Sequence, residues 1–311
     1  IRIDGAQLRV RIIGEGGNLG LTQLGRIEAA RHGVLINTDA VDNSAGVDCS
    51  DHEVNIKILL DRIVANGDLT TKQRNNLLVE MTDQVADLVL SDNYEPNVLL
   101  GNARVQARIL LPVHERMMHY LERAGVLDRP LEFLPDDERL AELAAAGQGL
   151  GSPEFCTLMA YAKISLTEQL NAEGLESDPF YDQVLQSYFP HQLVDRFGDQ
   201  LAEHPLRRQI VSTVVANSIV NRGGITFVYR VLEETGASAP EVARAYSVVR
   251  EVFGPPSYWA EIEALDNQAP TLAQAALFLE VRRLLDRATR WFLTTRGGRL
   301  DVGGEIARFL G

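Results

Sequence analysis

Four glycines, Gly14, Gly16, Gly17 and Gly20, stand close together near the start of the chain in the order GxGGxxG. Glycine lets a backbone approach a ligand closely, and the first amides of a following helix favour an anion. Such a turn can hold the phosphates of a dinucleotide, although the usual dinucleotide pattern is GxGxxG. The glycines alone leave two interpretations equally open: a nucleotide-binding turn, or a purely structural link between a strand and a helix.

Small polar and acidic residues form a second group. Residues 39–46 are predicted to be a polar loop, longer than most connections, and Asp39 stands where an acid that binds ribose is expected. Residues 48–53 (DCSDHE) then precede an apolar segment. Ser50, with Glu53 three residues later, is typical of a capping box at a helix start. We expect this helix start to bind a carboxylate as well, because free amides at a helix N-terminus attract anions.

Two strands and one helix must position these groups. Residues 8–13 (LRVRII) alternate as a strand does, residues 21–32 carry apolar side chains at helical spacing, and residues 34–37 (VLIN) resemble a second strand. Gly33 is expected to end the helix. The order predicts a parallel βαβ unit, with its ligands at the carboxyl edge. From about residue 59 onward helical periodicity dominates, and we expect roughly ten helices.

The overall charge and composition exclude several classes of function. The 311 residues carry a formal net charge of −13, which argues against nucleic acid, because that binding needs clustered Lys and Arg. No apolar run approaches the roughly 20 residues that cross a bilayer, and no signal peptide is visible. Cys49 and Cys156 lie far apart, which suits a reducing compartment. We therefore expect a cytoplasmic protein with no nucleic-acid or membrane partner.

The segments around the glycines also match a known family in order and spacing. Residues 15–18 (EGGN), 38–39 (TD) and 43–47 (NSAGV), followed by Ser50 and an acidic position, resemble the cofactor domain of the glutamate dehydrogenases. Residues 217–229 (NSIVNRGGITFVY) resemble the large bacterial NAD-specific branch of that family. The resemblance covers the chain nearly from end to end.

The resemblance implies NAD as the cofactor and places the glycine turn near the nicotinamide rather than at the pyrophosphate. It implies that Asn18 lies near the nicotinamide ribose, that Asn43 lies near the reacting carbon, and that Ser50 contacts a substrate carboxylate. The chain departs from the family at Asp51 and His52, where aromatic residues are common, so the pocket shape differs. The candidate substrate-binding residues are Asn43 and Ser50. The candidate cofactor-binding residues are Gly14, Glu15, Gly16, Gly17, Asn18, Asp39 and Asn43.

The implied reaction is the NAD-dependent oxidative deamination of L-glutamate to 2-oxoglutarate and ammonia, by a homo-oligomer. The catalytic lysine of the family is expected upstream of Ile1, so the chain is expected to be a fragment that is inactive alone. Lys57 lies in an apolar run and is no substitute. The implied fold is an α/β remnant of a Rossmann-type dinucleotide-binding domain in residues 1–60, followed by an all-α C-terminal domain in residues 61–311. The chain is predicted to be predominantly α overall.

Two other functions stay open. The helical part can be a regulatory or oligomerisation module of a multidomain protein whose catalytic centre lies elsewhere. The chain can also belong to a dehydrogenase of another amino acid, because the lysines that read the side-chain carboxylate in the family are not found here.

No metal site is expected. His114 and His119 are five residues apart, which separates them by about 140° around a helix. A polar run can attract a divalent ion through its carboxylates, but the resemblance implies no metal; this run comprises Asp48, Asp51, His52 and Glu53. Cys49 is expected to be a small buried residue. Five aromatic residues are expected to lie in the core: Phe253, Tyr258, Trp259, Trp291 and Phe292.

Overall fold

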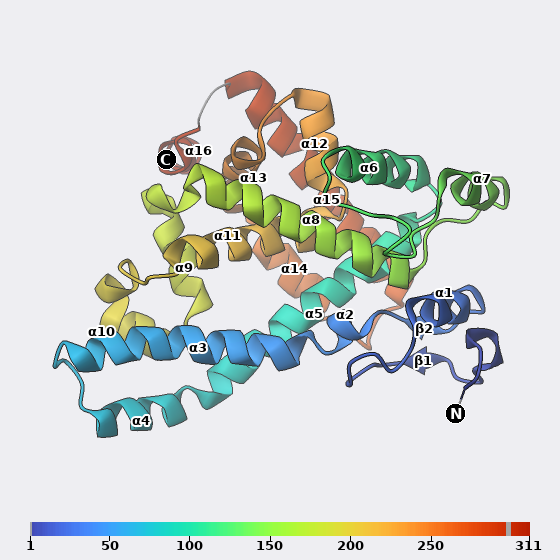
Figure 1. The fold of residues 1–311 in the computed structure, drawn as a ribbon. Coiled ribbons are helices and arrows are strands. Elements are labelled where there is room, and N and C mark those ends of the chain that lie inside the picture. Colours follow the sequence, from blue (N-terminus) through green and yellow to red (C-terminus); the bar gives the residue numbers. More distant parts are fainter. Residues whose placement is uncertain (1, 297–299) are drawn as a thin grey trace.

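Helices make up most of the structure, a computed structural model that describes residues 2–296 and 300–311 (Figure 1). Strand β1 (Ile12–Ile13) pairs in parallel with β2 (Leu35–Ile36), and α1 (Gln23–Arg31) connects them. The predicted βαβ unit and the predominantly helical character are therefore confirmed. Each strand is shorter than the sequence pattern suggested, because only two residue pairs meet in register.

Local signals set the ends of α1. The hydroxyl of Thr22 accepts a hydrogen bond from the amide of Gly25, which satisfies one of the free amides in the first turn. After the helix, Gly33 has a φ of +88°, a conformation that glycine adopts without strain. The predicted stop at Gly33 is confirmed. A small core of Ala29, Val34 and Ile36 holds α1 on the strands.

The segment after β2 differs from the prediction. Residues 39–46 are not a loop, because they form α2 (Asp39–Asp42) and the first turn of α3 (Ser44–Ala65). The helix start predicted at Ser50 is therefore wrong. Asn93, from a distant part of the chain, holds the true start: its Nδ2 donates to the Val41 carbonyl at 3.0 Å and to Ser44 Oγ at 2.8 Å.

The remaining elements are helical. In chain order they are η1 (Gly5–Gln7), α4 (Thr71–Glu80), α5 (Thr82–Gln106), α6 (Leu111–Arg123), α7 (Asp137–Ala145), α8 (Ser152–Glu173), η2 (Leu175–Ser177), η3 (Pro179–Tyr181), α9 (Asp182–Tyr188), α10 (His191–Leu201), α11 (Arg207–Ser218), η4 (Ile219–Gly223, a π-helix), α12 (Phe227–Thr235), α13 (Ala239–Phe253), α14 (Pro255–Glu263), α15 (Thr271–Arg296) and α16 (Val302–Leu310). The sequence therefore underestimated the number of helices. None of those described combines the length and apolar character needed to cross a bilayer.

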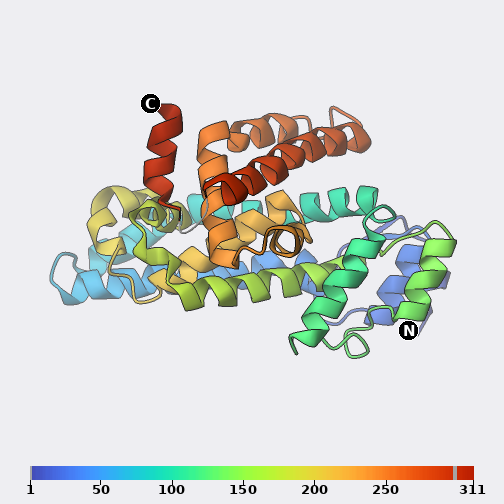
Figure 2. The same cartoon turned by 90° about the horizontal axis from the view of Figure 1, so that it is seen from above.

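One large apolar core joins the helices, from Val41 in α2 to Val302 in α16. Seen from above, α8 runs along one side of the molecule, and α15 and α16 lie on the other (Figure 2). The predicted domain boundary between residues 60 and 61 falls inside α3, and Ile56 and Ile63 on either side of it belong to the same core. The division into residues 1–60 and 61–311 stays a prediction.

The aromatic residues predicted to be core divide into two groups. Trp259 and Phe292 are buried, as expected. Phe253, Tyr258 and Trp291 are between 42% and 46% exposed, so the prediction was wrong for them. A helical segment shows only that one of its faces is buried, and these three side chains lie off that face.

Candidate functional site

The glycine turn after β1 is fixed by a buried ion pair. Glu15 and Arg26 are only 5% and 4% exposed, and Arg26 binds both carboxylate oxygens, with Nε–Oε1 at 2.6 Å and Nη2–Oε2 at 2.9 Å. The same guanidinium lies 3.0 Å from Asp39 Oδ1. Because the pair connects the turn to α1, Glu15 serves first to position the backbone around it.

Asp39 ties the turn to the segment after β2. Its carboxylate accepts hydrogen bonds from the amides of Leu19 at 2.7 Å and Ala40 at 3.0 Å. These bonds stabilise the ionised form, so the Leu19 amide, helped by the charge of Arg26, holds the pKa of Asp39 below its usual range. Both oxygens are therefore engaged within the protein.

The start of α3 presents amides that no side chain caps. Asn43 occupies the N-cap position, but its side chain makes no capping hydrogen bond. Instead that side chain lies against Gly46, where a Cβ atom would come within 3.0 Å of Asn43 Oδ1. Glycine at position 46 therefore makes room for the Asn43 amide. The Gly46 amide donates to the Asn43 carbonyl at 3.0 Å, and the positive end of the helix dipole favours an anionic oxygen beside this turn.

These segments border one open hollow of about 500 Å³, which we call the polar hollow. The strands are parallel, so the segments that follow them meet at the same edge. Three of the predicted site residues, Asn18, Asp39 and Asn43, line it. The complete lining is Asn18, Asp39, Ala40, Asn43, Ser44, Val47, Asp48 and Asp51.

Ser50 and the glycines lie outside the lining of the polar hollow. Ser50 is exposed inside α3, and the acidic partner of its predicted capping box, Glu53, pairs with Lys57 instead. Seven residues separate Ser50 from Asn43, so the two side chains point within about 20° of each other, roughly 10 Å apart along the helix axis. Ser50 thus shares a face with Asn43 but sits two turns further on.

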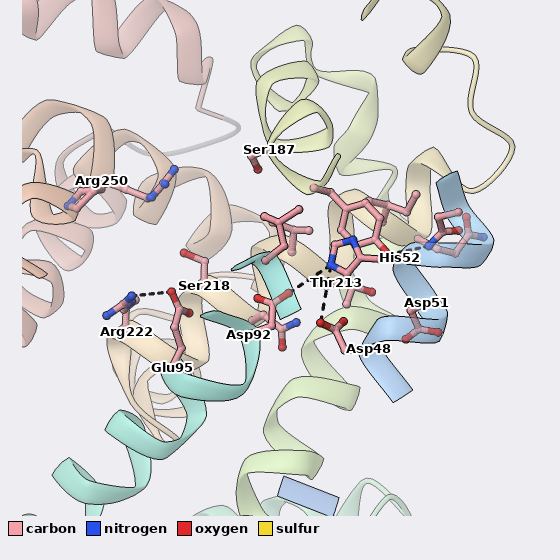
Figure 3. Close-up of a pocket in the computed structure, with 18 of the residues that line it drawn as sticks. Asp48, Asp51, His52, Asp92, Glu95, Ser187, Thr213, Ser218, Arg222 and Arg250 are labelled. Carbon is pink, nitrogen blue, oxygen red and sulfur yellow. Dashed lines mark hydrogen bonds and ion pairs between the residues drawn. The ribbon is translucent and has the colours of Figure 1, made fainter. Parts of the chain in front are cut away.

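A second cavity, of about 520 Å³, was not foreseen from the sequence; we call it the interhelical cavity. Residues from α3, α5, α9, α11, η4, α13 and α14 line it, so it exists only after these helices pack. Figure 3 shows acidic groups on one side, where Asp48 and Asp92 approach His52. Burial, and next the charge of Asp92, raise the pKa of Asp48 to about 6.

The other side of the interhelical cavity is held by an arginine. Arg222 pairs with Glu95 at 2.6 Å (Figure 3). It also pairs with Glu263 at 2.5 Å, and its guanidinium lies 4.7 Å from the ring centre of Trp259. Arg222 belongs to the π-helix η4, and the residue that follows this helix, Gly224, has a φ of +110°. The segment 217–229, singled out by its resemblance, therefore shapes this wall.

Two further expectations have outcomes in the structure. Cys49 is exposed, so its predicted burial was wrong. His114 and His119 both lie in α6, but His114 is buried beside Phe155, whereas His119 binds Asp137 at 2.8 Å. Their surroundings differ because five residues along a helix point in different directions.

The fold and site define a helical protein attached to a parallel βαβ unit, with a polar hollow at the carboxyl ends of its strands. Residues 147–311 match the family described as "Glutamate dehydrogenase, C-terminal", and residues 1–103 match "Bacterial NAD-glutamate dehydrogenase, catalytic domain". The chain belongs to this glutamate dehydrogenase family.

Similar proteins include three named "NAD-specific glutamate dehydrogenase". That of Pseudomonas aeruginosa is 50% identical over 309 residues, which is 99% of this chain and 19% of the relative. That of Halomonas elongata is 49% identical over 298 residues, covering 96% of this chain and 18% of the relative. That of Mycobacterium tuberculosis is 45% identical over 309 residues, covering 99% of this chain and 19% of the relative. The chain thus spans about a fifth of the length of these relatives.

Proposed function

We propose that the chain is part of an NAD-dependent glutamate dehydrogenase, which converts L-glutamate to 2-oxoglutarate and ammonia. The observation that carries the proposal is the polar hollow, which Asn18 and Asn43 line together in a chain of this family. In this proposal residues 1–60 are the C-terminal part of a Rossmann-type catalytic domain, and residues 61–311 are the helical domain that supports it.

The glycine turn suits a cofactor that approaches its backbone. A Cβ atom on Gly14, Gly16 or Gly17 would meet nothing within 4 Å, and none of the three has a positive φ. Neither packing among the described residues nor backbone conformation therefore demands glycine at these positions. Close approach of a ligand or of another backbone supplies the reason.

NAD, when bound, would accept a hydride from the α-carbon of glutamate. We assign the side-chain amides of Asn18 and Asn43 to orienting the groups that react, since both line the polar hollow. The uncapped amides of α3 favour an anionic oxygen there. Ser50, two turns further along the same helix face, is placed to donate its hydroxyl hydrogen to the more distant substrate carboxylate.

The test is steady-state kinetics on the full-length protein with Asn43→Ala and Ser50→Ala. We expect Ser50→Ala to raise the KM for glutamate roughly 10- to 100-fold, the effect of one hydrogen bond to a charged group. Asn43→Ala should lower kcat/KM by about 100-fold, because it removes a group beside the reacting atoms. Asn76→Ala, at an exposed position in α4, is the matched control and should change neither. Unchanged kinetics in both site variants would reject the site and favour the view that the chain is a helical module.

We also propose that the enzyme is a cytoplasmic homo-oligomer. Large apolar side chains are exposed on the C-terminal helices, including Leu272 (72%), Trp291 (46%) and Leu310 (61%). Of these, Trp291 packs against the half-exposed Phe309, with ring centroids 6.1 Å apart, and Leu310 follows it in the chain; an exposed apolar patch is typical of an interface. Light scattering on the full-length protein should give a mass that is a multiple of one chain, and a monomeric mass would contradict the proposal.

A further inference from the structure

Three side chains that can bind a metal converge at the edge of the interhelical cavity. Asp48 and His52 are four residues apart in α3, so they share one helix face, and Asp92 of α5 lies opposite them (Figure 3). His52 Nε2 is 3.8 Å from Asp48 Oδ2 and 3.7 Å from Asp92 Oδ2. One ligand atom from each of the three residues lies within 4.8 Å of the others.

The burial and bonding of the histidine give independent evidence for a ligand at this place. His52 is 1% exposed, yet neither of its ring nitrogens has a hydrogen-bond partner among the described residues. Asp48 Oδ2 is also buried without a hydrogen-bond partner. Buried polar atoms are normally satisfied, because leaving them unpaired forfeits their hydration.

The ring is nevertheless held in one orientation. It stacks on Tyr188 with centroids 4.3 Å apart and an interplanar angle of 16°. The Tyr188 hydroxyl in turn accepts a hydrogen bond of 2.8 Å from Asn55 Nδ2. This stacking holds the ring so that Nε2 faces the two carboxylates, 3.8 and 3.7 Å away.

The two carboxylates at this site have no Lys or Arg at ion-pair distance. In the part of the chain that the structure describes, His52 is the only basic group within that distance of Asp48 or Asp92. Lys163 in α8 acts on Asp92 only through its charge at longer range. Two carboxylates that face one imidazole repel each other unless a proton or a cation lies between them.

We propose that Asp48, His52 and Asp92 bind a divalent first-row transition-metal ion, such as Mn²⁺ or Zn²⁺. The ligand set of one imidazole and two carboxylates suits such ions, whereas Ca²⁺ and Mg²⁺ prefer oxygen alone. Ligand atoms around an ion at about 2.1 Å lie roughly 3.0–3.4 Å apart, so the His52–Asp48 and His52–Asp92 separations of 3.8 and 3.7 Å need to shorten by less than about 1 Å. The half-exposed Asp92 leaves an open side, where water from the cavity completes the coordination.

The site differs from the one the sequence suggested. The sequence alone predicted no metal, and the polar run it offered included Glu53, which pairs with Lys57 on the exposed side of α3. The third ligand is instead Asp92, which lies in α5, forty residues after His52. The ion would fasten α3 to α5 beside the polar hollow, since Asp48 lines both spaces. This inference does not depend on the proposed dehydrogenase activity.

The second carboxylate–histidine cluster of the chain supplies a matched control. Glu115, His119 and Asp137 also bring three potential ligand atoms within 4.8 Å. There, however, Arg129 donates to Asp137 Oδ1 at 2.8 Å, the same oxygen that His119 binds. An arginine already neutralises that carboxylate, so we expect no ion to bind at it.

The experiment is metal titration of the full-length protein after chelator treatment, by calorimetry with Mn²⁺ and Zn²⁺ and by absorption spectroscopy with Co²⁺. Wild type and His119→Gln should bind equally, whereas Asp92→Asn should bind one ion fewer per chain, or bind it more than about 100-fold more weakly. His52→Gln should remove the imidazole contribution to the Co²⁺ spectrum. Circular dichroism melts show whether each variant is folded, and Asp92→Asn is the decisive one because its side chain is half-exposed. Equal metal binding by wild type and Asp92→Asn, or no binding by wild type, would overturn the proposal.

Discussion

Replacing Glu15 with Gln should loosen the glycine turn without unfolding the helical core. The change removes the negative charge from a bidentate pair in which both residues are at most 5% exposed. Removing one partner of a buried pair costs about 3–5 kcal/mol. Asp39, at 3.0 Å from Arg26, still neutralises part of the positive charge of Arg26 in the variant. We therefore expect a loss of stability at the lower end of that range, about 3 kcal/mol.

Hydrogen exchange measured by mass spectrometry tests this expectation. The βαβ unit has its own small core, so it can open separately from the large one. A loss of about 3 kcal/mol accelerates exchange by roughly 100-fold, and the amides of Leu19 and Leu21, which bond Asp39 and Glu15, report it. Glu53→Gln, which breaks an exposed pair in α3, is the control and should leave exchange unchanged. If exchange in residues 14–21 were the same in wild type and Glu15→Gln, the pair would not be what holds the turn.

Two further predictions concern the helical part. Gly224→Ala should lower the free energy of unfolding by about 1–3 kcal/mol, because the φ of +110° and ψ of 157° at this position are accessible almost only to glycine. Gly101→Ala, inside α5, is the control and should be neutral or stabilising. Denaturant titration compares the two variants, and equal unfolding midpoints would contradict the argument from backbone strain. Burial lowers the pKa of His114 to about 4, below its unfolded value near 6.5, so the stabilisation from keeping it neutral is fully present above pH 6.5 and is lost as pH falls toward 4, by about 3 kcal/mol. His114→Leu should flatten this part of the stability–pH curve, and an unchanged curve would show that other groups control it.

Local sequence was sufficient wherever neighbouring residues decide the structure. The βαβ unit and the stop at Gly33 follow from periodicity and the conformational freedom of glycine, and both are present. The grouping of Asn18 with Asn43 in the polar hollow also follows, because segments after parallel strands meet at one edge. That part of the site could be predicted before any helix was packed.

The start of α3 shows where local reasoning failed. The Ser50–Glu53 spacing is that of a capping box, but the helix begins six residues earlier, at Ser44. The side chain of Asn93 fixes that start from α5, and no short window of sequence contains the contact. A capping pattern indicates only that a helix can begin at that residue. Here the tertiary hydrogen bonds of Asn93 stabilise a helix start at Ser44 instead.

The sequence by itself determined the family, the largely helical composition and the residues at the edge of the βαβ unit. Only the tertiary structure decided that Asp92 joins Asp48 and His52, and that Glu15 and Asp39 share Arg26. The physical reason is the same in both cases: burial makes a charge costly unless a partner meets it, and partners far apart in sequence meet only when helices pack. Spacing along the chain identifies side chains that can bind an ion or form an ion pair, and packing determines which of them come into contact.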